Sequence, residues 1–234
     1  MERVTEGPSP GTVLVSGGAS GLGRAVATAV RDAGGTPVVV DVREAPGFDT
    51  EIADVSDTRA AEDAVRAAAE RHGGLDAVVT AAGVDRPAPF GDLPGEEWER
   101  IVGVNLLGTA AVVRAALPCL RQARNGAVVT CASTLGLSVA ADATAYCASK
   151  WGIVGFTRAL AAELKGQVGV TLLVPGGMDT AFFERREERY KPPPGAKLAD
   201  PANVARAVLF ALAQPAGCEV RELIVTSPEE GSWP

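Results

Sequence analysis

The stretch Thr12-Val13-Leu14-Val15-Ser16-Gly17-Gly18-Ala19-Ser20-Gly21-Leu22-Gly23 decides the fold of this chain. It opens with a short apolar run that predicts a strand, and residues 22–33 predict a helix of small side chains. The glycines between them allow a tight turn, and Gly23 lets the helix press on the strand. The backbone N–H groups and the dipole at the start of such a helix favour a bound anion. We therefore expect this turn to hold the diphosphate of a dinucleotide.

The alternation of strand and helix continues outward from this stretch. Further helices are predicted over residues 58–71, 96–120, 145–164 and 201–213. Further strands are predicted over residues 37–41, 75–80, 127–131, 168–174 and 222–226. Such alternation predicts an α/β fold with a doubly wound, mainly parallel sheet and helices on both faces. We expect a single domain over residues 1–234, because a sheet covered on both faces keeps one core at this length.

One segment, residues 181–197, departs from the alternation. Phe182 and Phe183 stand near its start, a charged stretch follows over residues 184–191, and three prolines and a glycine occupy residues 192–195. Long connections of irregular composition often carry function. We expect a lid-like insertion after the sixth strand.

Charge and hydropathy exclude several classes of partner. The chain has 29 acidic and 22 basic residues, which give a formal net charge of −7. This charge repels a phosphate backbone, so no nucleic-acid partner is expected. No uninterrupted apolar run reaches about 18 residues, so no membrane span is expected. Residues 1–11 lack the basic and apolar regions of a signal peptide, and we expect a cytoplasmic protein.

Cysteine and histidine usage argues against metal and Ser-His-Asp chemistry. The four cysteines form no C-x-x-C pair, and His72 is the only histidine. Too few ligands are suitably spaced for a zinc site, so no metal is expected. A single histidine, expected to be solvated at the end of a charged helix, also removes most Ser-His-Asp chemistry.

Asp41 ends the second predicted strand, 18 residues after Gly23. A carboxylate at this place accepts hydrogen bonds from an adenosine ribose diol and repels a 2′-phosphate. Ser20 in the turn supplies no cation to offset that repulsion, so we expect NAD. NADP is the alternative, because Arg43 lies two positions further on and an arginine can clamp a phosphate.

Tyr146 and Lys150 are four residues apart on a predicted helix, so both side chains can reach one pocket. A free tyrosine has a pKa of about 10, and a nearby ammonium favours the phenolate. Lys150 is thus expected to make Tyr146 usable as a general acid and base near neutral pH. Ser133 follows a strand end 13 residues before Tyr146, where its hydroxyl can hold a substrate oxygen.

The order and spacing of these motifs resemble the short-chain dehydrogenase/reductase family from about Thr12 to Thr226. The stretch from Ser16 to Gly23 is similar to the family turn T-G-x-x-x-G-x-G, with serine in the threonine place. Tyr146-Cys147-Ala148-Ser149-Lys150 is similar to Y-x-x-x-K, and Pro175-Gly176-Gly177-Met178-Asp179-Thr180 resembles P-G-x-x-x-T.

The resemblance implies a nicotinamide-dependent oxidoreductase and a role for each matching residue. It implies catalytic roles for Ser133, Tyr146, Lys150 and Asn105, with Asn105 anchoring a water of the proton relay. Lys150 would also bond the nicotinamide ribose. The cofactor-binding residues are then expected to be Gly17, Ser20, Gly21, Leu22, Gly23, Asp41, Asp54, Val55, Ala82, Gly83, Tyr146, Lys150, Pro175, Gly176, Met178 and Thr180. A homodimer or homotetramer formed through residues 96–120 and 145–164 is also implied.

Two segments depart from the family pattern. Thr80-Ala81-Ala82-Gly83 stands where members carry N-A-A-G or N-N-A-G, so a supporting amide is missing, and Thr80 is expected to take over a hydrogen bond. Residues 227–234 replace the Asp-Gly-Gly tail of many members. Trp233 there either packs on a neighbouring subunit or belongs to a frayed end.

The expected substrate is a secondary alcohol or ketone with an apolar body. Leu135, Val139 and Phe182 are the predicted wall residues, although pockets and cores share this composition. Two alternatives stay open: a dinucleotide-binding sensor without turnover, and a different reaction on the same cofactor, such as an acyl-thioester ketoreductase or an epimerase.

Overall fold

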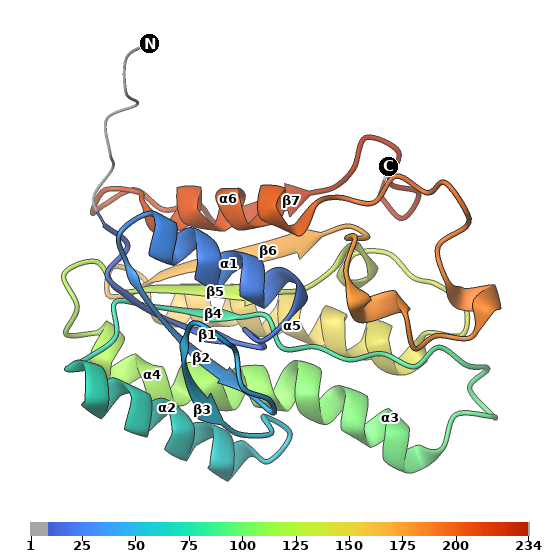
Figure 1. Cartoon of the computed structure of the whole chain (residues 1–234), viewed down its shortest axis with the longest axis horizontal. Coiled ribbons are helices and arrows are strands. Elements are labelled where there is room, and N and C mark those ends of the chain that lie inside the picture. Colours follow the sequence, from blue (N-terminus) through green and yellow to red (C-terminus); the bar gives the residue numbers. More distant parts are fainter. Residues whose placement is uncertain (1–8, 234) are drawn as a thin grey trace.

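The computed structural model describes residues 9–233, so the expectation for the first eight residues lies outside the described part of the chain. Within that part, seven strands form one parallel sheet in the order β3-β2-β1-β4-β5-β6-β7 (Figure 1). The strands are β1 (Thr12–Ser16), β2 (Thr36–Asp41), β3 (Asp49–Ile52), β4 (Ala77–Thr80), β5 (Ala127–Cys131), β6 (Gly169–Pro175) and β7 (Glu222–Val225). The doubly wound α/β fold is confirmed.

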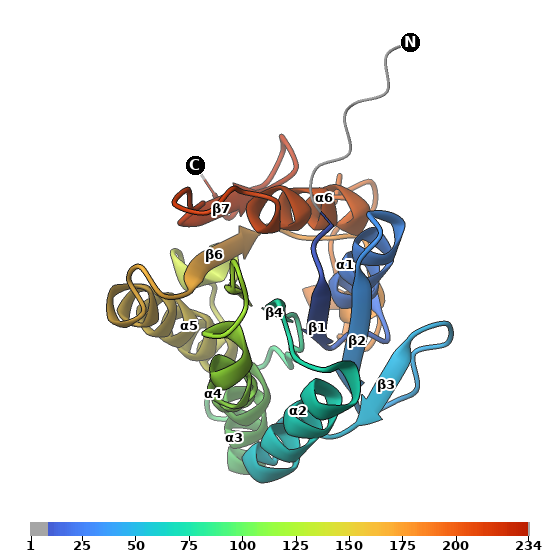
Figure 2. The same ribbon diagram turned by 90° about the vertical axis from the view of Figure 1, so that its left-hand side faces the viewer.

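Helices cover both faces of the sheet (Figure 2). On one face lie α1 (Gly21–Asp32) and α6 (Pro201–Leu212), and on the other lie α2 (Thr58–His72), α4 (Thr109–Leu120) and α5 (Thr144–Glu163). Alternate valines of the central strands feed the two cores, so that Val13 and Val15 pack under α1 while Leu14 packs under α2. This alternation explains why the strands read as continuous apolar runs.

The strand order reverses direction between β1 and β4, and a crevice opens at such a switch point beyond the carboxyl ends of the strands. Gly17 follows β1 with a left-handed φ of +76°. A Cβ on Gly17 would lie 2.6 Å from the backbone of Ala82, which follows β4. A Cβ on Gly23 would lie 2.2 Å from the carbonyl oxygen of Gly17, so the predicted close contact of helix and turn is confirmed.

The single helix predicted over residues 96–120 is divided into three segments. It consists of α3 (Gly95–Val102), a π-helical turn η1 (Gly103–Gly108) and α4. By length and composition alone the run Gly95–Leu120 is apolar enough to cross a membrane, but half of its apolar window is buried inside the fold. Its apolar side chains, including Ile101 and Val112, face the core. Periodicity along a sequence does not reveal a widened turn, because π-helical turns are short and local.

The edge strand β3 was not predicted from the sequence. Three of its four residues, Asp-Thr-Glu-Ile, are polar, and all four are partly or fully exposed, unlike the residues of the buried strands. The end of α2 holds this edge: Arg71 and His72 both bond the Asp49 carboxylate, with distances of 3.0 and 2.7 Å. The expectation that His72 is merely solvated was therefore wrong, since it pairs with an acid 23 positions earlier in the chain.

Candidate active site

The glycine turn leaves backbone N–H groups available at the start of α1. Ser20 is the N-cap residue, and its side chain makes no capping hydrogen bond. Leu22 buries its side chain in the core, so its backbone N–H is the group it can offer. Gly21 has a φ of +52°, and a Cβ there would lie 3.5 Å from the Thr180 side chain. The loops after β1 and β6 thus meet here, and the N–H groups fit a diphosphate.

Asp41, at the end of β2, bonds the glycine turn. Its carboxylate is nearly buried; Oδ2 accepts from the Ala19 N–H at 3.0 Å, and Oδ1 accepts from the Arg43 N–H at 3.1 Å. Each carboxylate oxygen of Asp41 can still accept one more hydrogen bond through its second lone pair. The Arg43 guanidinium donates to Ser20 Oγ at 3.4 Å. An acid and a base therefore both contact the turn at the site where adenosine specificity is expected.

Asn105 sits in the π-helical turn η1 and is fully buried. Its Oδ1 accepts from the Val84 N–H at 2.8 Å, and its Nδ2 donates to the Val84 carbonyl and to Ser149 Oγ, both at 3.0 Å. A Cβ on Gly83 would lie 3.5 Å from Asn105 Oδ1 and 3.7 Å from Lys150 Nζ. The widened turn thus brings Asn105 against the loop after β4 and close to the α5 lysine.

Lys150 is 4% exposed, and its Nζ donates to the Cys131 carbonyl at the end of β5 with a distance of 2.8 Å. Burial lowers the pKa of its ammonium. The same Nζ lies 5.6 Å from the centroid of the Tyr146 ring, one turn earlier on α5. The Lys150 ammonium and the Tyr146 ring therefore lie close together, which is the arrangement that their spacing predicts.

The pKa of Tyr146 is raised, mainly by burial, and the hydrogen bond with Ser133 offsets part of that rise. Desolvation is the largest cause of this shift, and the lowering of the phenol pKa by the Lys150 ammonium stays a prediction. Ser133 caps the short 3-10 helix η2 (Thr134–Gly136), and its Oγ accepts from the Leu135 N–H at 3.2 Å. The pocket therefore holds its phenol protonated at neutral pH.

Residues 181–197 reach the same pocket through 3-10 helices η3 (Ala181–Phe183) and η4 (Glu188–Tyr190). The Phe182 ring lies 5.9 Å from the Tyr146 ring between centroids. Arg186 donates to the Asp85 carboxylate at 2.6 Å, and the Tyr190 hydroxyl donates to Asp142 at 2.8 Å. Asp85 and Arg186 were missed by sequence reasoning. No local signal pairs two residues that are 101 positions apart.

The loop after β6 is held by the C-terminal tail. Glu230 Oε2 accepts from the Gly177 N–H at 2.7 Å, and a Cβ on Gly176 would collide with that carboxylate at 2.3 Å. Ser232 Oγ lies 2.6 Å from Thr134 Oγ1, beside Ser133. The tail is thus folded on its own chain as far as Ser232, and the alternative of a frayed end is wrong there. Pro175 ends β6, and Met178 and Thr180 lie on the loop that the tail supports.

Several predicted residues lie at the margin of this cluster. Asp54, beyond the end of β3, accepts hydrogen bonds from Ser56, and Val55 is buried against Gly108. Val139 is 76% exposed. Thr80 Oγ1 is buried without a hydrogen-bond partner, so the expectation that Thr80 replaces the missing amide is wrong.

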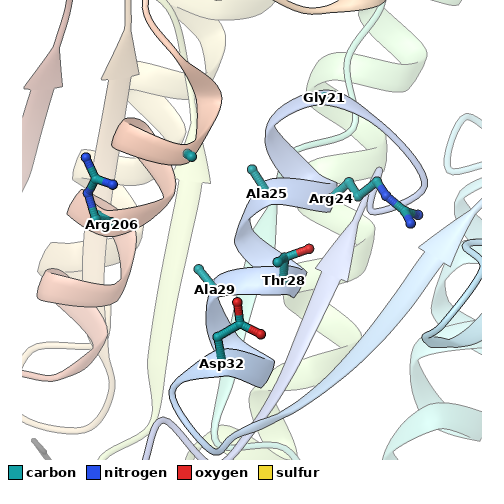
Figure 3. Close-up of a pocket in the computed structure, with 8 residues that line it drawn as sticks. Gly21, Arg24, Ala25, Thr28, Ala29, Asp32 and Arg206 are labelled. Carbon is teal, nitrogen blue, oxygen red and sulfur yellow. The ribbon is translucent and has the colours of Figure 1, made fainter.

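A hollow of about 400 Å³ lies apart from this cluster, between α1 and α6 (Figure 3). Gly21 is its one residue in common with the predicted cofactor-binding set. Arg24 and Arg206 line it, but Arg24 donates to the Pro46 carbonyl and lies over the Phe48 ring, and Arg206 bonds Asn203. Both cations are engaged within the chain, so the hollow contributes nothing to the chemistry around Tyr146.

Comparison with known proteins agrees with this geometry. The family model described as short chain dehydrogenase matches residues 11–191. The D-beta-hydroxybutyrate dehydrogenase of Cupriavidus necator is 34% identical over 221 residues, covering 88% of this chain and 84% of that protein. The 3-oxoacyl-(acyl-carrier-protein) reductase of Thermotoga maritima is 29% identical over 216 residues, covering 84% and 88% respectively. The structure of an alcohol dehydrogenase from Thermococcus sibiricus, complexed with 5-hydroxy-NADP, matches with a TM-score of 0.82 at 25% identity, over 93% of this chain and 97% of that one.

Proposed function

Because this chain belongs to the short-chain dehydrogenase/reductase family and is a nicotinamide-dependent oxidoreductase of alcohols and ketones, we propose that it uses NAD and that Tyr146 exchanges the proton of the reacting oxygen. When bound, the nicotinamide supplies or accepts the hydride. This chain's own side chains would bind the cofactor, orient the substrate and protonate its oxygen.

The residues present fit a dinucleotide. The glycine turn offers free N–H groups for the diphosphate, and Gly17 and Gly83 leave space that a Cβ would fill. Asp41 would bind the adenosine ribose, and Lys150 the nicotinamide ribose. The other residues assigned to the cofactor are Ser20, Gly21, Leu22, Gly23, Asp54, Val55, Ala82, Tyr146, Pro175, Gly176, Met178 and Thr180.

Tyr146 is the general acid in ketone reduction. Burial raises the pKa of its phenol, so the protonated form that an acid needs is the one present at neutral pH. Ser133, whose hydroxyl lowers the pKa of that phenol, would hold the substrate oxygen beside it. A water anchored by Asn105, together with the Lys150 ammonium, would relay a proton from solvent back to Tyr146. Alcohol oxidation needs the phenolate, so the oxidative rate rises with pH.

One observation carries this proposal: the buried Asn105 and Lys150 and the side chains of Ser133 and Tyr146 converge on one pocket beside Gly83. A sensor without turnover has no need of a phenol, a hydroxyl and an ammonium held together in this way. The catalytic interpretation is therefore preferred over the sensor.

Tyr146→Phe is the test, and the chain offers a matched control because its second tyrosine, Tyr190, lies in the segment over the same pocket. Loss of a general acid costs about 10²-fold or more in kcat. Tyr146→Phe should lose at least that much while the cofactor dissociation constant stays unchanged. Tyr190→Phe should keep its turnover within a few fold. Undiminished turnover in Tyr146→Phe would falsify the assignment.

The proposed substrate is a secondary alcohol or ketone with an apolar body, with Leu135, Val139 and Phe182 as wall residues. The Phe182 ring against Tyr146 supports an apolar wall at the reacting carbon. Reduction of an acyl thioester is a second candidate, favoured by the similarity to the reductase of Thermotoga maritima. A panel of simple ketones and 3-oxoacyl thioesters, followed by absorbance of the reduced nicotinamide, separates the two by kcat/KM.

A further inference from the structure

An ion pair is built into the wall of the pocket that holds Tyr146. Asp85 lies on the loop after β4, and Arg186 lies between η3 and η4; the guanidinium Nη2 donates to Asp85 Oδ2 at 2.6 Å. The two side chains are 4% and 16% exposed, whereas both members of the Arg189–Glu187 pair on the same segment are more than 60% exposed. Removing both charges from water costs desolvation free energy, so a buried ion pair is weak evidence of a stabilising role. We therefore look for a functional role of this pair.

The pair is connected to Tyr146 through aromatic rings. The Arg186 guanidinium lies 5.1 Å from the Phe182 centroid and 4.7 Å from the Phe183 centroid. Phe182 in turn lies 5.9 Å from the Tyr146 ring. Arg186 Nη1 also donates to the Tyr190 carbonyl at 3.3 Å, which holds the segment together. Releasing the Asp85 contact would therefore free the ring that covers Tyr146.

Both charges also act on the reacting groups. Asp85 raises the pKa of Tyr146 while Arg186 lowers it, and both effects are smaller than that of burial. The pKa of Asp85 is itself raised by burial, against the opposing charges of Arg186 and Lys150. The pair therefore lies within electrostatic range of the position that a substrate would occupy beside Tyr146.

We propose that Asp85 is a specificity-determining residue: by neutralising Arg186 in the pocket wall, it restricts the site to uncharged carbonyl substrates and excludes carboxylates. An unpaired guanidinium would be a ready partner for a carboxylate. Here Nη2 is paired with Asp85 and Nη1 with the Tyr190 carbonyl, and the buried Nε is the one guanidinium nitrogen without a partner among the described residues. The other buried cation, Lys150, is bonded to the Cys131 carbonyl and is 4% exposed. Phe182 and Leu135, two of the proposed wall residues, are apolar and carry no charge. This inference rests on the proposed function and names the substrate class of the same site.

The test compares two substrates that differ in charge and little in shape: acetoacetate and its methyl ester. The net charge of the pair is zero in the wild type, positive in Asp85→Asn, negative in Arg186→Gln and zero again in the double variant. The ratio of kcat/KM for ester over acid should therefore be highest in Arg186→Gln, intermediate in the wild type and the double variant, and lowest in Asp85→Asn. Removing the Asp85 carboxylate should lower this ester-over-acid ratio about tenfold or more relative to the wild type.

Glu187→Gln is the matched control, because it removes an acid from the exposed pair on the same segment. Its ratio should stay within about twofold of the wild type, as surface pairs contribute little. The inference is overturned if the wild type prefers the acid, or if Asp85→Asn slows both substrates by the same factor, which is the outcome of a merely structural role. Should Asp85→Asn not fold, Arg186→Gln alone must still raise the ratio above the wild-type value.

A second readout separates this inference from the proposed function. Residues 184–191 contain three arginines and a lysine, so trypsin reports how firmly the segment is held. Asp85→Asn should be cut there faster than the wild type, and Glu187→Gln at the wild-type rate. Absence of any nicotinamide-linked turnover in the wild type would reject the proposed function. Equal cleavage of all three proteins would reject the role of Asp85.

Discussion

At the scale of single residues, burial decides the chemistry of Tyr146. Spacing on α5 brings an ammonium to within 5.6 Å of the ring centroid, and that spacing alone predicts an acidic phenol. Burial opposes it and raises the pKa of Tyr146, while the same burial lowers the pKa of Lys150. Desolvation disfavours the charged form of both groups, so burial favours a neutral phenol.

Asp41 and Arg43 contact the glycine turn together, and we predict that these two residues make the choice between NAD and NADP. Asp41→Ala should weaken NAD binding about tenfold or more and improve relative use of NADP, since the carboxylate that repels a 2′-phosphate is gone. Arg43→Ala should leave NAD binding nearly unchanged and weaken NADP binding. Fluorescence titration with both cofactors measures this. A wild type that prefers NADP would show that Arg43 outweighs Asp41.

At the scale of elements, the C-terminal tail connects two loops of the candidate site. Glu230 bonds Gly177 on the loop after β6, and Ser232 bonds Thr134 beside Ser133. Burial raises the pKa of Glu230, but hydrogen bonds from Ser232 and from the Gly177 N–H outweigh it and the pKa is lowered. The charged form is therefore the one that holds the tail in place.

Glu230→Gln should lower the free energy of unfolding by about 1 kcal/mol at pH 7, because hydrogen bonds to a charged acceptor are lost. A lowered folded-state pKa contributes stability above the unfolded-state value and loses it as the pH falls through the folded-state value. The difference between variant and wild type should therefore shrink as the pH falls below the ordinary value of 4.5. Urea unfolding at pH 7 and at acid pH measures it. Glu229→Gln, in an exposed pair with Lys197, is the control and should change little.

At the scale of the whole molecule, two apolar surfaces remain exposed in the single chain. Leu107 on η1 and Trp151 on α5 are 51% and 49% exposed, and Phe210 on α6 and Ile224 on β7 are 59% and 42% exposed. Figure 2 shows α6 and β7 on a different side of the molecule from α3, α4 and α5. A homo-oligomer through the helices of residues 96–120 and 145–164 stays a prediction, and these side chains indicate where to test it.

Leu107→Glu should convert the oligomer to smaller species in sedimentation, because a charge would be buried at the predicted contact. Phe210→Glu tests the second surface: a tetramer would become a dimer, and a dimer through α4 and α5 would be unaffected. Wild-type chains that sediment as monomers would rule out the predicted contact.

The alternation of apolar strands and helices, the glycine turn and the spacing of Tyr146 and Lys150 are local patterns. The fold could therefore be predicted from the sequence, whereas the roles of the site residues stay a prediction. Every predicted strand recurs within two residues of its expected bounds. The edge strand β3 was not predicted, because an edge strand needs no apolar run. The π-helical turn η1 was not predicted either, because it widens within an otherwise regular helix.

Only the tertiary structure decided the contacts between distant segments. The Asp85–Arg186 pair joins residues 101 positions apart, and the Glu230–Gly177 bond joins residues 53 positions apart. The direction of the Tyr146 pKa shift belongs here too, since desolvation depends on everything packed around the phenol. Sequence periodicity indicates which face of its own helix or strand each residue occupies. Charge pairing and burial depend on which elements the fold brings together, and that information is not local.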